Sequence, residues 1–116
     1  MCTQSTLNYI IQSVREAAQY IFADSLDKVI LFGSYARGDY DSESDIDIMI
    51  LLDIPAESIN KHFDEIVKLS SRLSLESEDC TTVSIIMQDK GTFSKYETVL
   101  PFFRNISNEG IVIYAA

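Results

Sequence analysis

The chain has 116 residues, which allows one domain with a modest hydrophobic core but no separate substrate domain. Hydrophobic residues make up 47% and charged residues 23%, a composition typical of globular proteins. The net charge of −9, from 18 acidic and 9 basic residues, argues against a surface that binds nucleic-acid duplexes, because such surfaces need clustered Lys and Arg.

The first half of the chain predicts one helix and two strands. A helix capped by Ser5 is indicated by apolar residues spaced three and four apart: Leu7, Ile11, Val14, Ala18 and Ile21. The apolar run 29–32 predicts a buried strand that ends at Gly33, and residues 39–44, which lack large aliphatic side chains, predict a loop. Residues 46–52 predict a second strand in the interior of the sheet, because the run is apolar on both faces.

The second half predicts two helices and two further strands. Pro55 is well placed in the first turn of a helix, and residues 81–87 predict a third strand followed by a turn at 89–91. A helix beginning near Thr92 should be kinked or split by Pro101, and residues 111–114 predict a last strand. Tyr96, Phe102 and Phe103 are expected to pack against the sheet, with a partner surface as the alternative for any of them that are exposed. The order α-β-β-α-β-α-β indicates an α/β (α+β) fold, with helices on one small mixed sheet and residues 1–116 forming one domain.

The strongest functional signal is the run GSYARGDYDSESDIDIMI, residues 33–50. Glycine at 33 lets backbone N–H groups approach a phosphate, and Ser34 adds a hydroxyl donor. Asp45 and Asp47 alternate on the predicted strand, so their carboxylates face the same side, roughly 6.6 Å apart along it. Two anions so close repel, and a bound cation is the usual remedy. The run therefore indicates phosphoryl or nucleotidyl transfer with Mg²⁺.

Each motif residue also has a structural interpretation. Arg37 is equally suited to contacting a triphosphate and to pairing with Asp39 or Asp41. Ser44 is a candidate nucleotide contact, although bracing the turn before the strand suits it better. A solvent-facing role for Asp45 and Asp47 is disfavoured, because the residues that follow, 49–52, are typical of a buried strand.

The stretch GSYARG…SDID resembles the signature of the DNA polymerase beta-type nucleotidyltransferase superfamily. More closely, it resembles the minimal nucleotidyltransferase (MNT) domains that are often encoded beside a helical HEPN partner. The resemblance implies a nucleotidyltransferase-like fold in which Gly33 and Ser34 hold the nucleotide triphosphate. Arg37 and Ser44 are added as candidate nucleotide-binding residues. The resemblance also implies that Asp45 and Asp47 ligate two Mg²⁺ ions and that AMP passes from ATP to a hydroxyl of a partner protein, as in antitoxin-type adenylylation.

The superfamily uses a third catalytic carboxylate on the next strand, and this sequence offers several positions for it. If the pattern aligns on the start of that strand, Asp79 supplies the carboxylate, with Glu78 as a substitute. If it aligns on the middle, Thr82 or Ser84 stands where an aspartate is expected. We predict Asp79 as the third catalytic residue. Strand alternation puts Asp79 on the opposite face from Ser84, so one bulge would be required if that face carries the site.

Two alternatives to protein adenylylation remain open. The chain could be a catalytically weakened interaction subunit that binds and masks a partner, or a transferase acting on a small molecule of the antibiotic type. Neither Cys2 nor Cys80 belongs to a zinc or disulfide pattern, and the sequence lacks both a basic leader and an apolar run of membrane-spanning length. We therefore expect a cytoplasmic protein with no membrane partner.

Overall fold

The computed structural model describes residues 3–77 and 82–116. Its helices are α1 (Gln4–Phe22), α2 (Ser34–Arg37), α3 (Phe63–Glu76), α4 (Lys90–Tyr96) and α5 (Pro101–Glu109), with 3-10 turns η1 (Ala23–Ser25) and η2 (Ala56–His62). Its strands are β1 (Leu26–Phe32), β2 (Ile46–Leu52), β3 (Val83–Asp89) and β4 (Ile111–Ala115). The α/β class expected from the sequence is confirmed.

The strands form one mixed sheet in the order β3-β2-β1-β4. Strand β1 pairs antiparallel with both β2 and β4, whereas β2 pairs in parallel with β3. As predicted, β2 lies in the interior of the sheet, with neighbours on both edges. Parallel pairing of β2 and β3 requires a crossover, and α3 supplies it.

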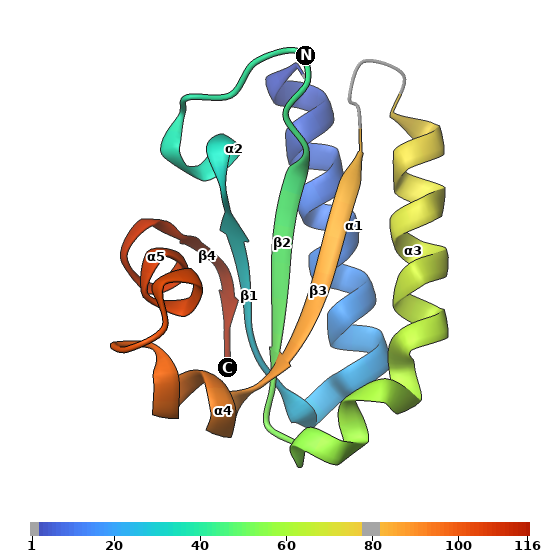
Figure 1. Ribbon diagram of the computed structural model, residues 1–116. Helices are drawn as coiled ribbons and strands as arrows, with labels where there is room; N and C mark the ends of the chain where they lie inside the picture. The colour runs from blue at the N-terminus through green and yellow to red at the C-terminus, as the bar shows by residue number, and fades with distance from the viewer. Residues whose placement is uncertain (1–2, 78–81) are drawn as a thin grey trace.

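Helices cover the two faces of the sheet unequally (Figure 1). The helices α1 and α3 pack on one face, where alternate residues of β2, among them the fully buried Ile46, Ile48 and Ile50, join the larger core. On the other face α4 and α5 cover a smaller cluster: Ile30, Met49, Leu51, Phe93 and Ile106. Asp47 lies on this second face, and Asp45 immediately precedes β2. The larger core therefore holds one face of β2, while the opposite face stays open near α2.

Several local expectations need correction. Thr3 rather than Ser5 caps α1, because its Oγ1 accepts a hydrogen bond from the N–H of Thr6. The turn expected at 89–91 is the start of α4, since the Asp89 carboxylate accepts the N–H of Thr92 at 2.7 Å. The helix expected from Pro55 starts as the turn η2 before α3. The predicted break at Pro101 is confirmed, because α4 and α5 are separate helices.

The register of the sheet places three side chains of the open face in one row. Phe32 of β1 pairs with Asp47 of β2, and Asp47 pairs with Ser84 of β3. Hydroxyls of α3 fix the start of β3, because Ser70 donates to the carbonyl of Val83 and Ser74 accepts its N–H at 3.0 Å. Within residues 3–77 and 82–116, no helix is both long and apolar enough to cross a membrane.

Candidate active site

The site is built around a contact between Gly33 and Asp47. Gly33 follows directly on β1 and has φ 76° and ψ −157°, a conformation that is essentially restricted to glycine. A Cβ at this position would overlap the Asp47 carboxylate oxygen and lie 3.3 Å from its carboxyl carbon. The absent side chain therefore makes room for the carboxylate beside the backbone that begins α2.

The loop that joins β1 to β2 is closed by its own contacts. Tyr35, which is buried, stacks on Tyr40 with ring centroids 4.2 Å apart. Gly38 ends α2 in the left-handed conformation, with its N–H bonded to the carbonyl of Ser34. The loop therefore brings the two halves of the motif, which are separated by more than ten residues in the sequence, to one end of the sheet.

Ser44 belongs to the turn that leads into β2. Its Oγ accepts the backbone N–H of Asp41 at 2.9 Å and donates to the Asp41 carboxylate at 3.2 Å. The same carboxylate accepts the N–H of Glu43. The bracing role considered for Ser44 is thus present, and its contact with a nucleotide stays a prediction.

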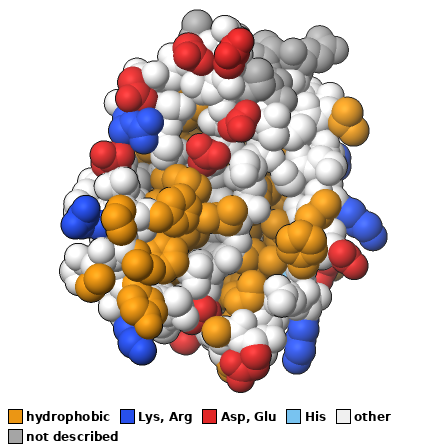
Figure 2. All heavy atoms as spheres, in the orientation of Figure 1, with side chains coloured by type: hydrophobic (Ala, Val, Ile, Leu, Met, Phe, Trp, Pro, Cys, Tyr) orange, Lys and Arg blue, Asp and Glu red, His pale blue; other side chains and the backbone are white. Residues whose placement is uncertain are grey.

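Asp45 and Asp47 differ in their surroundings. Asp45 is exposed just before β2, and Asp47 is half-buried within the strand. Burial, together with the neighbouring charge of Asp45, raises the pKa of Asp47, while Arg37 opposes this rise more weakly. Figure 2 shows acidic side chains gathered on this face at the end where α2 lies, above a hydrophobic area. The oxygens of these two carboxylates are of the type that Mg²⁺ prefers, so Asp45 and Asp47 are the candidate residues for holding a divalent metal.

Arg37 forms ion pairs with two other carboxylates. Its Nε donates to Asp39 at 3.2 Å, and its Nη1 donates to Glu109 of α5 at 3.4 Å. All three side chains are substantially exposed, so these ion pairs contribute little stability and can rearrange. Of the two partners expected for Arg37, Asp39 pairs with it, whereas Asp41 bonds Ser44. The Arg37 side chain remains accessible to a phosphate, and that contact stays a prediction.

The position next to Asp47 on β3 holds a hydroxyl and not a carboxylate. Ser84 is the register partner of Asp47, and the carbonyl of Thr82 accepts the N–H of Ile46 at 2.9 Å. Asp79 and Glu78 lie outside the described residues, so the prediction of a third acid at Asp79 stands as made. Among the residues that the structure describes, no group of three or more His, Cys, Asp or Glu side chains could hold a metal ion.

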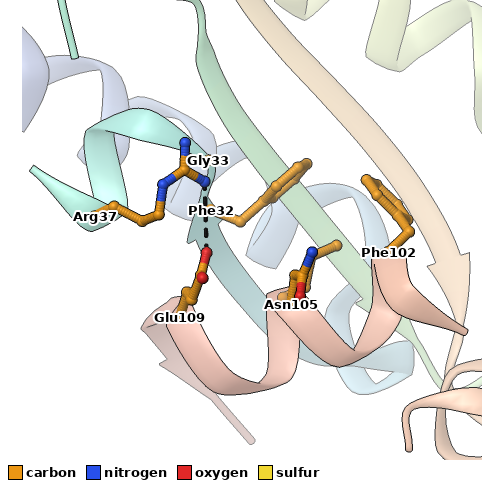
Figure 3. Close-up of a pocket in the computed structure, with 7 residues that line it drawn as sticks. Phe32, Gly33, Arg37, Phe102, Asn105 and Glu109 are labelled. Carbon is orange, nitrogen blue, oxygen red and sulfur yellow. Dashed lines mark hydrogen bonds and ion pairs between the residues drawn. The ribbon is translucent and has the colours of Figure 1, made fainter. Parts of the chain in front are cut away.

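A pocket of about 190 Å³ opens beside Gly33, between the end of β1 and α5 (Figure 3). Its walls come from Phe32, Phe102, Asn105, Arg37 and Glu109. Asn105 and Glu109 of α5 were not predicted as site residues, and Phe102 was expected to pack against the sheet or to belong to a partner surface. The spacing of Phe102, Asn105 and Glu109, three and four residues apart, places them on one helical face and was the available signal.

Comparisons with known proteins agree with this geometry. A family model described as "Nucleotidyltransferase domain" matches residues 9–103. Two proteins of Methanocaldococcus jannaschii, each named as a candidate protein adenylyltransferase (MJ0141 and MJ0604), are 48% and 40% identical. The first alignment covers 58% of this chain and 66% of that protein, and the second covers 75% and 77%. The chain thus spans slightly less than two thirds of the first relative's length.

Solved structures share the fold at low sequence identity. A toxin–antitoxin crystal structure with AMP-PNP matches at a TM-score of 0.53 and 17% identity, covering 91% of this chain and 73% of that one. A nucleotidyltransferase candidate from Sulfolobus solfataricus matches at 0.52 and 21% identity, covering 97% and 85%. These likenesses confirm the nucleotidyltransferase fold.

The Gly33–Asp47 contact predicts unequal effects of two alanine substitutions. Gly33→Ala should cost backbone strain and force the Asp47 carboxylate aside, whereas Gly38→Ala should cost only the strain of its φ of 86°, since nothing lies within 4 Å of a Cβ there. In urea unfolding we expect a loss of about 1–2 kcal/mol for Gly38→Ala and a larger loss for Gly33→Ala. Equal losses of stability would mean that the position of the Asp47 carboxylate does not require a residue without a side chain at position 33.

The raised pKa of Asp47 predicts a pH-dependent stability. Because the folded state binds this proton more tightly than the unfolded chain, stability falls as pH rises from about 3.9 through the raised pKa, and it stays lower above it. Without divalent metal, Asp47→Asn should therefore unfold at a higher temperature than the parent at pH 7. The gain should vanish below about pH 3.9.

The exposed Asp53, just beyond the other end of β2, provides the control for the loss of one negative charge. Asp53→Asn removes one negative charge without touching the pair. A gain at pH 7 equal to that of Asp47→Asn would attribute the effect to net charge and contradict the assignment to burial and Asp45.

Proposed function

The chain belongs to the nucleotidyltransferase domain family, and we propose that it transfers AMP from ATP, with Mg²⁺, to a hydroxyl of a partner protein. The observation that carries the proposal is the packing of the Gly33 backbone against the Asp47 carboxylate, with Asp45 immediately before the same strand. A phosphate held at Gly33 and Ser34 would lie beside both carboxylates. We further propose that residues 1–116 form one nucleotidyltransferase domain, since all four strands share one sheet.

The residues present fit a divalent metal. Asp45 and Asp47 supply carboxylate oxygens, and burial together with mutual repulsion leaves the charge of Asp47 poorly compensated. Bound Mg²⁺ would neutralise the phosphates and lower the pKa of the acceptor hydroxyl. We assign Asp45 and Asp47 to holding it, Gly33 and Ser34 to positioning the triphosphate, and Arg37 and Ser44 to further nucleotide contacts.

The reaction is an in-line displacement at the α-phosphorus. The acceptor oxygen forms a bond to that phosphorus, the bond from phosphorus to the β-bridging oxygen breaks, and pyrophosphate leaves. The acceptor hydroxyl loses its proton. We propose that Asp79 takes part in this activation as the third acid, with Glu78 as the alternative.

A protein acceptor is supported by the relatives of the chain. The two archaeal relatives are named as candidate protein adenylyltransferases, and one neighbour in fold comes from a toxin–antitoxin complex with AMP-PNP. We propose an antitoxin-type adenylylation, with a HEPN-type helical protein as the partner that the MNT resemblance implies.

One observation favours a second function, an interaction subunit with weakened turnover. The register places Ser84 beside Asp47, at a position where a carboxylate would be the third acid next to the Asp45–Asp47 pair. A hydroxyl at this position neither ligates Mg²⁺ as strongly nor accepts a proton at neutral pH. Such a chain would still bind nucleotide and could mask a partner.

The carboxylate pair predicts a joint loss of metal binding and transfer. Asp45→Asn combined with Asp47→Asn should abolish the thermal stabilisation by Mg²⁺ and ATP and lower AMP transfer by at least about a hundredfold. Transfer is measured by incubating the chain with α-labelled ATP and the protein encoded beside it, and by following the label and the added mass of one AMP on that protein. Asp53→Asn is the charge-matched control, and an unchanged response in the double variant would refute the metal site.

The third acid predicts a second difference between variants. Asp79→Ala should lower transfer to the acceptor while preserving stabilisation by Mg²⁺ and ATP, because the remaining pair still holds the metal. Ser84→Ala should leave both unchanged. Transfer that survives Asp79→Ala would contradict the choice of third acid, and a loss of transfer in Ser84→Ala would show that the β3 hydroxyl takes part in the site.

A further inference from the structure

We propose that the pocket beside Gly33 binds the base of the nucleotide, with Phe102 as its stacking surface and Asn105 selecting adenine. This inference rests on the proposed function, because it extends the triphosphate site at Gly33 and Ser34 to the rest of the same substrate. Figure 3 shows the pocket residues reaching from α5 and α2 toward the end of β1.

The pocket and the carboxylate pair adjoin the same strand end. Gly33 both lines the pocket and packs against Asp47, and Phe32, another lining residue, is the register partner of Asp47. A nucleotide with its phosphates at Gly33 therefore has its base within reach of this pocket. The opposite face of the sheet is closed by the larger core, so the base cannot lie there.

The size and lining of the pocket suit one flat ring system. Its volume of about 190 Å³ is below the roughly 300–1,000 Å³ of sites that enclose whole drug-sized ligands. Phe102 is 52% exposed and meets Phe32 edge-on, with centroids 5.8 Å apart, so an aromatic face stays available. Bases stack on such faces without needing a charge.

Asn105 adds the means to distinguish bases. Its amide offers one acceptor and a donor group, which match the N6 amino group and the adjacent ring nitrogen of adenine. Guanine presents two acceptors on the corresponding edge, so the amide oxygen would face an acceptor. The Arg37–Glu109 ion pair bridges α2 and α5 and forms the polar wall of the same pocket.

Binding of three ligands separates the base from the phosphates. Mg²⁺-ATP, Mg²⁺-GTP and Mg²⁺-tripolyphosphate are titrated by calorimetry into the parent chain, Phe102→Ala and Asn105→Ala. Phe102→Ala should weaken ATP roughly ten- to a hundredfold and leave tripolyphosphate unchanged. Asn105→Ala should reduce the preference for ATP over GTP by at least about fivefold.

The matched control is Asn108→Ala, which changes the same residue type on the same helix outside the pocket. Retained tripolyphosphate binding also reports that each variant is folded. If the parent binds ATP and both pocket variants bind it equally well, the base lies elsewhere and the proposed function stands. If those variants lose only transfer to the acceptor, the pocket takes the acceptor and the inference is wrong. If the parent binds neither ATP nor tripolyphosphate, the proposed function fails and the inference fails with it.

Discussion

The fit of the Asp47 carboxylate against the bare backbone of Gly33 is the contact on which the rest of the site depends. It joins the end of β1 to the start of β2, and the pairing of Phe32 with Asp47 fixes how far the two strands are staggered. A shift of one residue would turn Asp47 into the larger core and Ile46 or Ile48 toward solvent. The loop that begins at Gly33 and the carboxylates are therefore one structural unit, held by the register of a single antiparallel pair.

This unit is unfavourable by itself, and the surrounding fold compensates for it. Gly33 has a backbone conformation that is open essentially only to glycine and costs chain entropy on folding, and Asp47 is partly desolvated beside another carboxylate. The compensation lies on the opposite side of β2, where Ile46, Ile48 and Ile50 are completely buried. Because α1 and α3 cover only that face near the site, stability and ligand access are divided between the two sides of one strand (Figure 1).

The features that could be predicted from the sequence are those encoded by patterns of neighbouring residues. The Asp-x-Asp alternation located the carboxylates, the apolar run 46–52 located an interior strand, and Pro101 located the break between helices. Features that need three dimensions were not predictable. The sequence left Ser84 as one of several positions that could lie beside the pair, and the β2–β3 register is what places it next to Asp47. The packing of α5 against β1 makes Phe102 and Asn105 part of a pocket, which the sequence pattern alone did not indicate. The start of α4 was missed because a buried Asp89 cap can be mistaken for a turn residue.

An acidic protein must bind a polyanionic nucleotide without strong long-range attraction. At a net charge of −9 the general field repels ATP, and Arg37 is already paired with Asp39 and Glu109. In the proposed reaction, metal and nucleotide would therefore bind as a pair, since the carboxylates would attract the cation and the cation would attract the phosphates. A pocket beside Gly33 that includes the rings of Phe32 and Phe102 suits this situation, because stacking adds affinity that does not depend on charge. Contacts to the base would then determine which nucleotide is preferred, and the metal-bound phosphates would provide the chemistry common to the family.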